Sequence, residues 1–261
     1  MKANNLRPVD IAWQAIFDKY DILSHDFDHA PFSISAEQIK NATSHFKNTS
    51  QREVRILCKL DTRESTPAIF QQNRLFILPT QNGKYSMVKG EGYVDIPRIE
   101  KNTQIYKPKL DFQPITATIG NSEMQFLDYA YAVSLVRSFM NDDSLVLTIR
   151  GRKYTPRFDF RVGKQSITVE SVQTEVDAGY EGKTQVVLVE AKNSLAKNTI
   201  IRQLYYPFRQ WSEHLKTSKQ VYTLFFEKSG NDFSFWQFTF KEVADYNSIE
   251  LVRSEKFQIV D

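Results

Sequence analysis

The sequence has only one cysteine, Cys58, among its 261 residues. A single cysteine excludes an intrachain disulfide and any zinc site built from several cysteines. No apolar run approaches the length of about 18 residues that is typical of a transmembrane helix. The opening residues, MKANNLRPVD, lack the apolar stretch of a signal peptide. We therefore expect a cytoplasmic protein.

The chain also lacks a strong charge of either sign, an internal repeat and a low-complexity tract. Lys and Arg number 34 against 31 Asp and Glu, for a formal net charge of +3. This balance permits a polyanionic partner without requiring one, because local clustering of charge matters more than the total. Aromatic residues are abundant at 13% and favour a β-rich core.

The first hundred residues predict short helices followed by short strands. Apolar residues recur at helical spacing from Pro8 to Tyr20, and Ser35-Ala36-Glu37-Gln38 is a capping box that opens a second helix, to about Phe46. Glu53 to Leu60 alternates like a strand, and a helical turn is expected from Ser65 to Gln72. Further short strands are predicted at Leu75–Leu78, Lys84–Val88 and Gly92–Ile96, with a hairpin turn at Asn82-Gly83.

A proline-containing stretch, YKPKLDFQP from Tyr106 to Pro114, indicates a domain boundary. We expect an N-terminal α+β domain over residues 1–112 and a second domain over residues 113–261. The second should begin with one long helix from Ser122 to Met140, and a later helix from Lys197 to Leu215 should be interrupted by Pro207. Strands are predicted at Leu145–Arg150, Arg157–Val162, Ile167–Ser171, Gln173–Asp177, Gln185–Ala191, Val221–Phe226 and Phe233–Phe240. This order predicts an α+β, or mixed α/β, core in which helices flank a central sheet.

The stretch TEVDAGYEGKTQVVLVEAKN, from Thr174 to Asn193, has the strongest chemical signal. An apolar run ends in Glu190-Ala191-Lys192, and residues two apart on a strand share a face, so Glu190 and Lys192 point the same way. Glu175 and Asp177 share a face on the preceding strand. If the glycine-containing loop between the strands turns the chain back antiparallel, these carboxylates meet beside the lysine.

Carboxylates and a lysine at one point suit the hydrolysis of a phosphodiester. Mg²⁺ takes one or two carboxylates in addition to waters and substrate phosphate oxygens. A bound metal lowers the pKa of its water and neutralises charge on the phosphate. Lys192 could orient or deprotonate the attacking water, helped by a pKa that desolvation and a nearby metal would lower.

Asp177, followed after twelve residues by Glu190-Ala191-Lys192 at the end of an apolar strand, resembles the signature of the PD-(D/E)XK nuclease superfamily. Val176 stands where the name of the signature has proline. The resemblance implies a restriction-endonuclease-like core in which Asp177 and Glu190 bind Mg²⁺ and Lys192 positions or activates water.

Two further stretches resemble a group of type II restriction endonucleases. They are REVRILCKLDTRESTPAIFQQNRLFILPTQNGKYSMV and IIRQLYYPFRQW. This likeness implies sequence-specific cleavage of double-stranded DNA that leaves 5′-phosphate ends, and an N-terminal domain for DNA recognition or dimerisation. It further implies a homodimer, because palindromic sites are cut by two-fold symmetric enzymes, and a cognate DNA methyltransferase encoded in the same genome.

Several other residues are candidate contributors to the site. Glu175 is a possible auxiliary acid, and Gln203 resembles a glutamine that lies near the site in related nucleases. Glu123, with Asp128 on the same helix, could bring an acid toward the metal, although an acid at a helix start also suits the helix dipole. The candidate DNA-binding residues of the following basic segment are Lys197, Arg202 and Arg209.

Alternatives remain at each level. Asp159 is a second candidate for the first metal-binding aspartate, and SHDFDHA, from Ser24 to Ala30, is a metal cluster or a polar turn. A repair nuclease directed to DNA structure or damage, and a DNA-binding module without catalysis, are the alternative functions. The candidate base-reading arginines of the N-terminal domain are Arg52, Arg55, Arg63 and Arg74.

Overall fold

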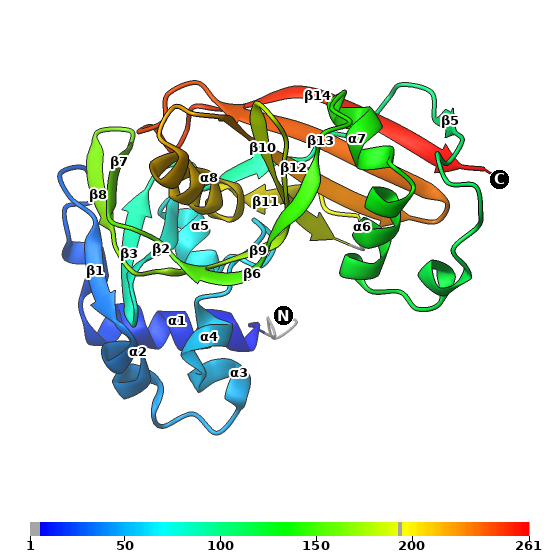
Figure 1. Ribbon diagram of the computed structural model, residues 1–261. Helices are drawn as coiled ribbons and strands as arrows, with labels where there is room; N and C mark the ends of the chain where they lie inside the picture. Colours follow the sequence, from blue (N-terminus) through cyan, green and yellow to red (C-terminus); the bar gives the residue numbers. More distant parts are fainter. Residues whose placement is uncertain (1–5, 193–194, 261) are drawn as a thin grey trace.

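The computed structural model describes residues 6–192 and 195–260. Short helices dominate the first part of the chain, and a large sheet dominates the second (Figure 1). The elements up to residue 106 are α1 (Pro8–Lys19), η1 (Ile22–Ser24), β1 (Phe32–Ser35), α2 (Ala36–Thr43), α3 (Thr49–Arg52), α4 (Val54–Leu57), α5 (Ala68–Gln72), β2 (Leu75–Gln81), β3 (Lys84–Lys89), β4 (Tyr93–Asp95) and β5 (Gln104–Tyr106). The later elements are η2 (Ile115–Thr118), α6 (Glu123–Ala132), α7 (Leu135–Met140), β6 (Val146–Tyr154), β7 (Phe158–Val162), β8 (Gln165–Val169), β9 (Gln173–Glu181), β10 (Gln185–Lys192), β11 (Asn198–Ile200), α8 (Ile201–Leu215), β12 (Gln220–Ser229), β13 (Asp232–Phe240) and β14 (Ile249–Ile259).

A seven-stranded sheet in the order β5-β14-β13-β12-β10-β9-β6 forms the centre of the described chain. It is mixed, because β10 pairs in parallel with β12 and β14 with β5, whereas the other neighbours are antiparallel. Helix α8 packs on one face, against β9, β10 and β12, and α6 packs on the other, against β10 and β12. The expected class, a mixed sheet flanked by helices, is confirmed.

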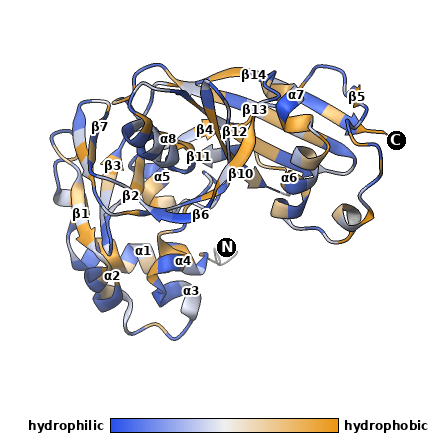
Figure 2. Ribbon diagram, viewed as in Figure 1, coloured by the Kyte–Doolittle hydropathy of each residue, from blue (hydrophilic) through white to orange (hydrophobic). Residues whose placement is uncertain are grey.

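Two hydrophobic clusters line the two faces of this sheet. Val186 and Leu188 of β10 lie in the cluster on the α8 side, and Val187 and Val189 lie in the cluster that includes α6 and α7. A strand buried on both faces must be apolar throughout, which explains the unbroken run before Glu190. Figure 2 shows hydrophobic residues concentrated in the central strands around β10 and β12.

The N-terminal part has its own core. Helices α1 to α5 enclose a third cluster against the three-stranded sheet β1-β3-β2. Helix α1 and the Ser35 capping box are confirmed, and Gly83, with φ of 72°, forms the predicted turn between β2 and β3. Glycine suits that turn because positive φ has no steric penalty there.

The strand predicted at Glu53–Leu60 is wrong, because this segment contains helix α4. Val54, Leu57 and Leu60 are buried, whereas Ile56 is 45% exposed. The buried positions therefore repeat every three residues, as on a helix, and not every two. Trp13 donates a hydrogen bond from Nε1 to the carbonyl of Leu57, 3.0 Å, which ties α4 to α1.

The single long helix predicted at Ser122–Met140 is also wrong, since it breaks into α6 and α7 at Ser134, whose φ is 67°. Tyr106 donates from its hydroxyl to the carbonyl of Val133 at 2.8 Å, so a carbonyl at the break is hydrogen-bonded. Helix α8 begins at Ile201, because residues 198–200 form β11 against β4, and it continues through Pro207 without the predicted interruption.

Residues on the N-terminal side of the predicted boundary at 112/113 join the central sheet. Strand β5 pairs with β14, and β4 pairs with β11 just before α8. The two parts of the chain are therefore connected by shared sheets as well as by the linker.

Candidate active site

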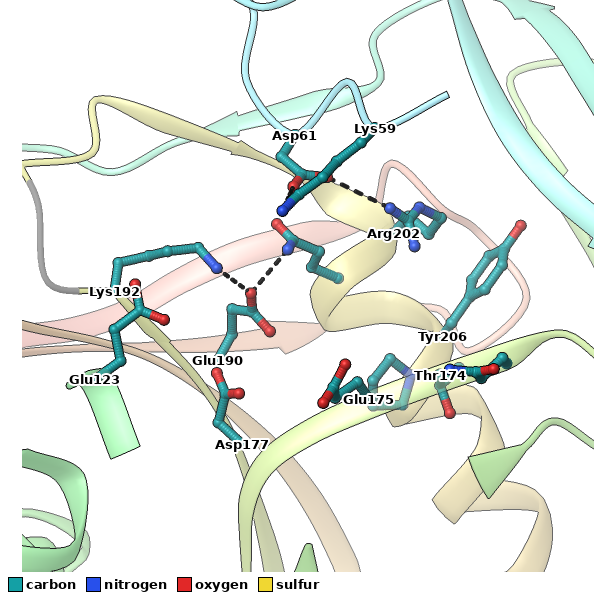
Figure 3. Close-up of a pocket in the computed structure, with 13 residues that line it drawn as sticks. Lys59, Asp61, Glu123, Thr174, Glu175, Asp177, Glu190, Lys192, Arg202 and Tyr206 are labelled. Carbon is teal, nitrogen blue, oxygen red and sulfur yellow. Dashed lines mark hydrogen bonds and ion pairs between the residues drawn. The ribbon is translucent and has the colours of Figure 1, made fainter. Parts of the chain in front are cut away.

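The acidic strand ends meet at the carboxyl end of β10. The antiparallel register places Val189 opposite Ala178, so the next residues along, Glu190 and Asp177, face each other across the two strands. The backbone N–H of Ala191 donates to Asp177 Oδ2 at 2.7 Å. Figure 3 shows both carboxylates in one pocket. The prediction that the strands return antiparallel and bring Asp177 to the Glu190-Ala191-Lys192 segment is confirmed.

A register shift in β9 positions Asp177. Ile149 and Gly151 of β6 are two residues apart, but their partners Gly179 and Val176 on β9 are three apart. Val176 packs in the cluster on the α8 side, whereas Ala178 packs in the cluster on the α6 side. An extra residue on one strand re-aims side chains in this way, and such bulges are common beside active sites.

Glu190 is held by two donors at one carboxylate oxygen. Lys192 Nζ lies 2.5 Å from Glu190 Oε1, and Gln203 Nε2 of α8 donates to the same oxygen at 2.8 Å. Gln203 is fixed in turn by Thr199, whose hydroxyl donates to Gln203 Oε1 at 2.7 Å. Glu190 Oε2 and Asp177 Oδ1 accept no hydrogen bond from residues 6–192 or 195–260, so each carboxylate retains an oxygen for another partner.

The surroundings of Glu190 and Asp177 disfavour the charged forms of both carboxyl groups. Burial raises the pKa of Glu190 from 4.5 to about 7, with Lys192 opposing the rise and Asp177 adding to it. Burial also raises the pKa of Asp177, although the hydrogen bond from the Ala191 N–H and the charge of Lys192 lower it. Carboxyl pKa values rise in this way where burial removes a carboxylate from water and a second carboxylate lies close to it.

Lys192 departs from its expected behaviour. Burial lowers the pKa of its ammonium as predicted, but Glu190, Glu123 and Asp177 outweigh burial, and the pKa lies above its ordinary value. Without a metal, Lys192 is therefore a positive charge and a hydrogen-bond donor. This state suits orienting a water or a phosphate oxygen better than removing a proton.

These residues line one cavity of about 340 Å³ at the end of the sheet. Its described lining includes five carboxylates, from Asp61, Glu123, Glu175, Asp177 and Glu190, and three cations, from Lys59, Lys192 and Arg202. The formal charge of the cavity is therefore −2. An anionic substrate would be repelled unless a cation of about two charges entered with it.

The auxiliary acids both line the cavity. Glu123, at the start of α6, interacts electrostatically with Asp177 and Lys192. Glu175 lies beside Arg152 on the neighbouring strand, with Arg152 Nε 3.3 Å from Glu175 Oε2. Figure 3 shows Glu123 on the Lys192 side of the pocket and Glu175 on the other. All three predicted auxiliaries, including Gln203, are thus near Asp177 and Glu190.

The three candidate DNA-binding cations lie in different surroundings. Lys197 is exposed in the segment before β11, and Arg202 lines the cavity. Arg209 is only 5% exposed, donates to the carbonyls of Asp159 and Val243, and pairs with Glu213 at 2.8 Å. A guanidinium enclosed in this way does not reach a phosphate. The prediction that Arg209 binds DNA is therefore wrong, and Arg209 instead connects α8 to neighbouring segments of the fold.

We expect Arg209→Met to lower the free energy of unfolding by about 2 kcal/mol, because it removes charged hydrogen bonds to buried carbonyls. Urea denaturation measures this change. Glu213→Gln is the matched control and should change stability by less, since Glu213 is exposed. Unchanged stability with a large loss of DNA affinity would contradict the structural role.

The two alternative metal-binding positions suggested by the sequence, Asp159 and the turn from Ser24 to Ala30, do not line this cavity. Asp159 lies on the β7–β8 hairpin and accepts from the Thr168 hydroxyl at 2.5 Å. His29 Nδ1 lies 2.6 Å from Asp26 Oδ2 in an exposed turn. Within the described residues, no group of three or more His, Cys, Asp or Glu side chains is arranged to hold a metal ion.

Two cavity residues, Lys59 and Asp61, were missed by the sequence interpretation. Lys59 lies in the segment predicted as a strand and Asp61 directly after it. Both are more than a hundred residues from Glu190, and no local pattern connects them with it. Among the candidate base readers, Arg63 pairs with Asp95 and Glu91, whereas Arg52, Arg55 and Arg74 are exposed.

The fold and the cavity define an α+β protein with an acidic, lysine-containing site at the carboxyl end of a central strand. Residues 88–258 match a family described as a domain of unknown function (DUF6997), and residues 10–87 match a second one (DUF6996). The first match spans more than half of the chain, which therefore belongs to the DUF6997 family. The two matches meet at 87/88, earlier than the boundary predicted at 112/113. No curated protein and no solved structure matches the chain. No helix in the described residues is long and apolar enough to span a membrane.

Proposed function

We propose that this protein is a Mg²⁺-dependent endonuclease of the PD-(D/E)XK type that hydrolyses phosphodiester bonds of double-stranded DNA. The observation that supports this most strongly is the meeting of Asp177 with Glu190 and Lys192 in a cavity of formal charge −2. The arrangement of β6, β9, β10, α8 and β12, with α6 on the opposite face, agrees with a restriction-endonuclease-like core.

The residues of the cavity fit a magnesium ion. Asp177 and Glu190 would hold it through Asp177 Oδ1 and Glu190 Oε2, the oxygens left without a described hydrogen-bond donor. Two carboxylates are sufficient, because Mg²⁺ retains several waters and binds substrate phosphate oxygens. When bound, the ion would neutralise the cavity and lower the pKa of a coordinated water.

The chain's own groups orient the reaction. Lys192, fixed by Glu190, presents its ammonium toward the cavity, where it can hold the attacking water or a non-bridging phosphate oxygen. Gln203 fixes the Glu190 carboxylate and thereby limits its rotation. The water oxygen forms a bond to phosphorus and gives up a proton, while the bond to the 3′ oxygen breaks and that oxygen takes up a proton. The products are a 5′-phosphate and a 3′-hydroxyl.

Within this class we favour a type II restriction endonuclease. The support is the resemblance of residues 52–88 and 200–211 to such enzymes; residues 52–88 run from the end of α3 into β3, and residues 200–211 cover most of α8. We expect a homodimer on a palindromic site, in the cytoplasm, and a neighbouring gene for a DNA methyltransferase that protects the same sequence.

The test is to incubate the protein with an unmethylated plasmid of known sequence, with and without Mg²⁺, and to sequence the ends produced. We expect discrete fragments with 5′-phosphates, all ending at one short motif, only in the presence of Mg²⁺. Chelation by EDTA should stop the reaction, and renewed Mg²⁺ should restore it.

The other outcomes separate the alternatives. A smear of fragments, or cutting confined to branched or mismatched DNA, would indicate a repair or nonspecific nuclease. Intact unmethylated plasmid, together with DNA binding that neither Mg²⁺ nor Lys192→Ala affects, would show a DNA-binding module and contradict the nuclease.

A further inference from the structure

The N-terminal part of the chain supplies one wall of the cavity. Lys59 and Asp61 follow helix α4, and they line the cavity together with Arg202 of α8. Figure 3 shows this group across the pocket from Asp177, with Glu190 between them. Asp61 is close enough to Glu190 to contribute to the rise of its pKa.

This wall is fixed to the element that leads into α8. The backbone N–H of Ile200 donates to the carbonyl of Asp61 at 2.8 Å, and the backbone N–H of Arg63 donates to Asn198 Oδ1 at 2.8 Å. In each bond one partner, Ile200 or Asn198, belongs to β11, directly before α8. The position of Lys59 and Asp61 is therefore set by the same backbone that places Arg202 and Gln203.

The cations of this wall are only loosely paired. Lys59 Nζ lies 3.9 Å from Asp61 Oδ2, and Arg202 Nη2 lies 3.6 Å from Asp61 Oδ1. Both distances exceed that of a hydrogen bond. One carboxylate is shared between two cations, which leaves a net positive charge at this wall. The third cation of the cavity, Lys192, is already hydrogen-bonded to Glu190.

We propose that Lys59 and Arg202 form a binding subsite for a DNA backbone phosphate that neighbours the scissile one, and that Asp61 partly neutralises the two cations until DNA binds. The proposal rests on the proposed nuclease function. The opposite part of the cavity is acidic. A DNA strand is therefore attracted to the wall that carries Lys59 and Arg202, and it can approach the carboxylates only together with a cation. An ammonium and a guanidinium are the usual partners of phosphate oxygens.

A role in phosphate binding predicts effects of opposite sign for the cations and for Asp61. Lys59→Met and Arg202→Met should each weaken duplex binding about five- to tenfold and lower the slope of log affinity against log salt by about 1. Asp61→Asn should strengthen binding and leave the slope equal or larger, because it releases both cations. A merely structural network would lose affinity in all three variants.

The experiment measures the binding of a short fluorescent DNA duplex at several salt concentrations with Ca²⁺ in place of Mg²⁺, and a gel verifies that the probe stays intact. Lys84→Met is the matched control, since Lys84 is an exposed lysine of the β2–β3 hairpin outside the cavity, and it should bind like the wild type. Thermal unfolding of each variant verifies folding.

The two proposals fail in different ways. If the wild type binds and cleaves DNA but the Lys59 and Arg202 variants keep its affinity and salt slope, the subsite is overturned and the nuclease remains. Weaker binding by Asp61→Asn would also overturn the subsite. If the wild type neither binds nor cleaves DNA, both proposals are overturned.

Discussion

Lys192→Met is expected to lower the rate of DNA cleavage by about 10²- to 10⁴-fold while leaving a folded protein that still binds DNA. Methionine keeps the length of the side chain but removes the ammonium that contacts Glu190 Oε1. Asp177→Asn should have an effect of similar size, because it removes a metal-binding charge. Initial rates on a plasmid or duplex containing the identified site measure both effects.

Asparagine is preferred to alanine at position 177 for a structural reason. Asp177 accepts the N–H of Ala191, which is completely buried, and an amide oxygen can still accept it. Alanine would leave that N–H without a partner at a cost of about 1 to 3 kcal/mol, so a loss of activity could reflect a loss of folding. Asp159→Asn is the control at the rival aspartate and should cleave normally. Near-normal cleavage by both site variants would reject the site.

The second large effect is expected in the pH dependence of stability without divalent cations. The pKa of Glu190 is raised from 4.5 to about 7, so the folded chain binds this proton more tightly than the unfolded chain does. As the pH rises from about 4.5 to 7, the folded state loses that advantage. The free energy of unfolding should therefore fall by roughly 3 kcal/mol from this group.

Urea denaturation of the wild type and of Glu190→Gln across this pH range measures the contribution. The variant should show a smaller fall, although not zero, because the pKa of Asp177 is shifted in the same direction. Glu170→Gln, at an exposed glutamate after β8, should retain the wild-type slope. Identical slopes in the wild type and Glu190→Gln would refute the expected cost of the buried carboxylate. Added Mg²⁺ should flatten the wild-type slope if the carboxylates bind it, which tests the metal site independently of activity.

Residues from both matched regions line the same cavity. Residues 10–87 supply Lys59 and Asp61, whereas Asp177, Glu190 and Lys192 lie within residues 88–258. If Lys59 and Arg202 bind phosphate, the N-terminal part is required for the catalytic site as well as for any reading of bases. Separating the two parts would then remove a wall of the cavity.

Local sequence was sufficient where a single element determines the structure. The apolar run of β10 predicted a strand, and the structure buries that strand on both faces, where polar side chains are disfavoured. The Ser35 capping box and the Asn82-Gly83 turn could also be predicted, because each depends on interactions within a few residues of the chain. The spacing of Asp177 and Glu190 was informative because two adjacent antiparallel strands bring such positions together.

Predictions from local sequence were wrong where contacts between distant segments of the chain determine the structure. The segment of α4 alternates like a strand, but the packing of Val54, Leu57 and Leu60 in the N-terminal core selects a helix. Arg209 looked like part of a basic helix face, yet the chain folds the β7–β8 hairpin and residue 243 over it.

The sequence by itself therefore determined most strands of the central sheet, the helix that follows the motif and the meeting of two acids with a lysine, because these follow from periodicity and from neighbouring strands. Only the tertiary structure decided which cations enter the cavity. Asp61 lies there, with Lys59 two residues before it, because the N–H of Ile200 in β11 binds the Asp61 carbonyl. Arg209 does not reach the cavity because the core encloses it. Such contacts join residues far apart in the chain, so no local pattern could specify them.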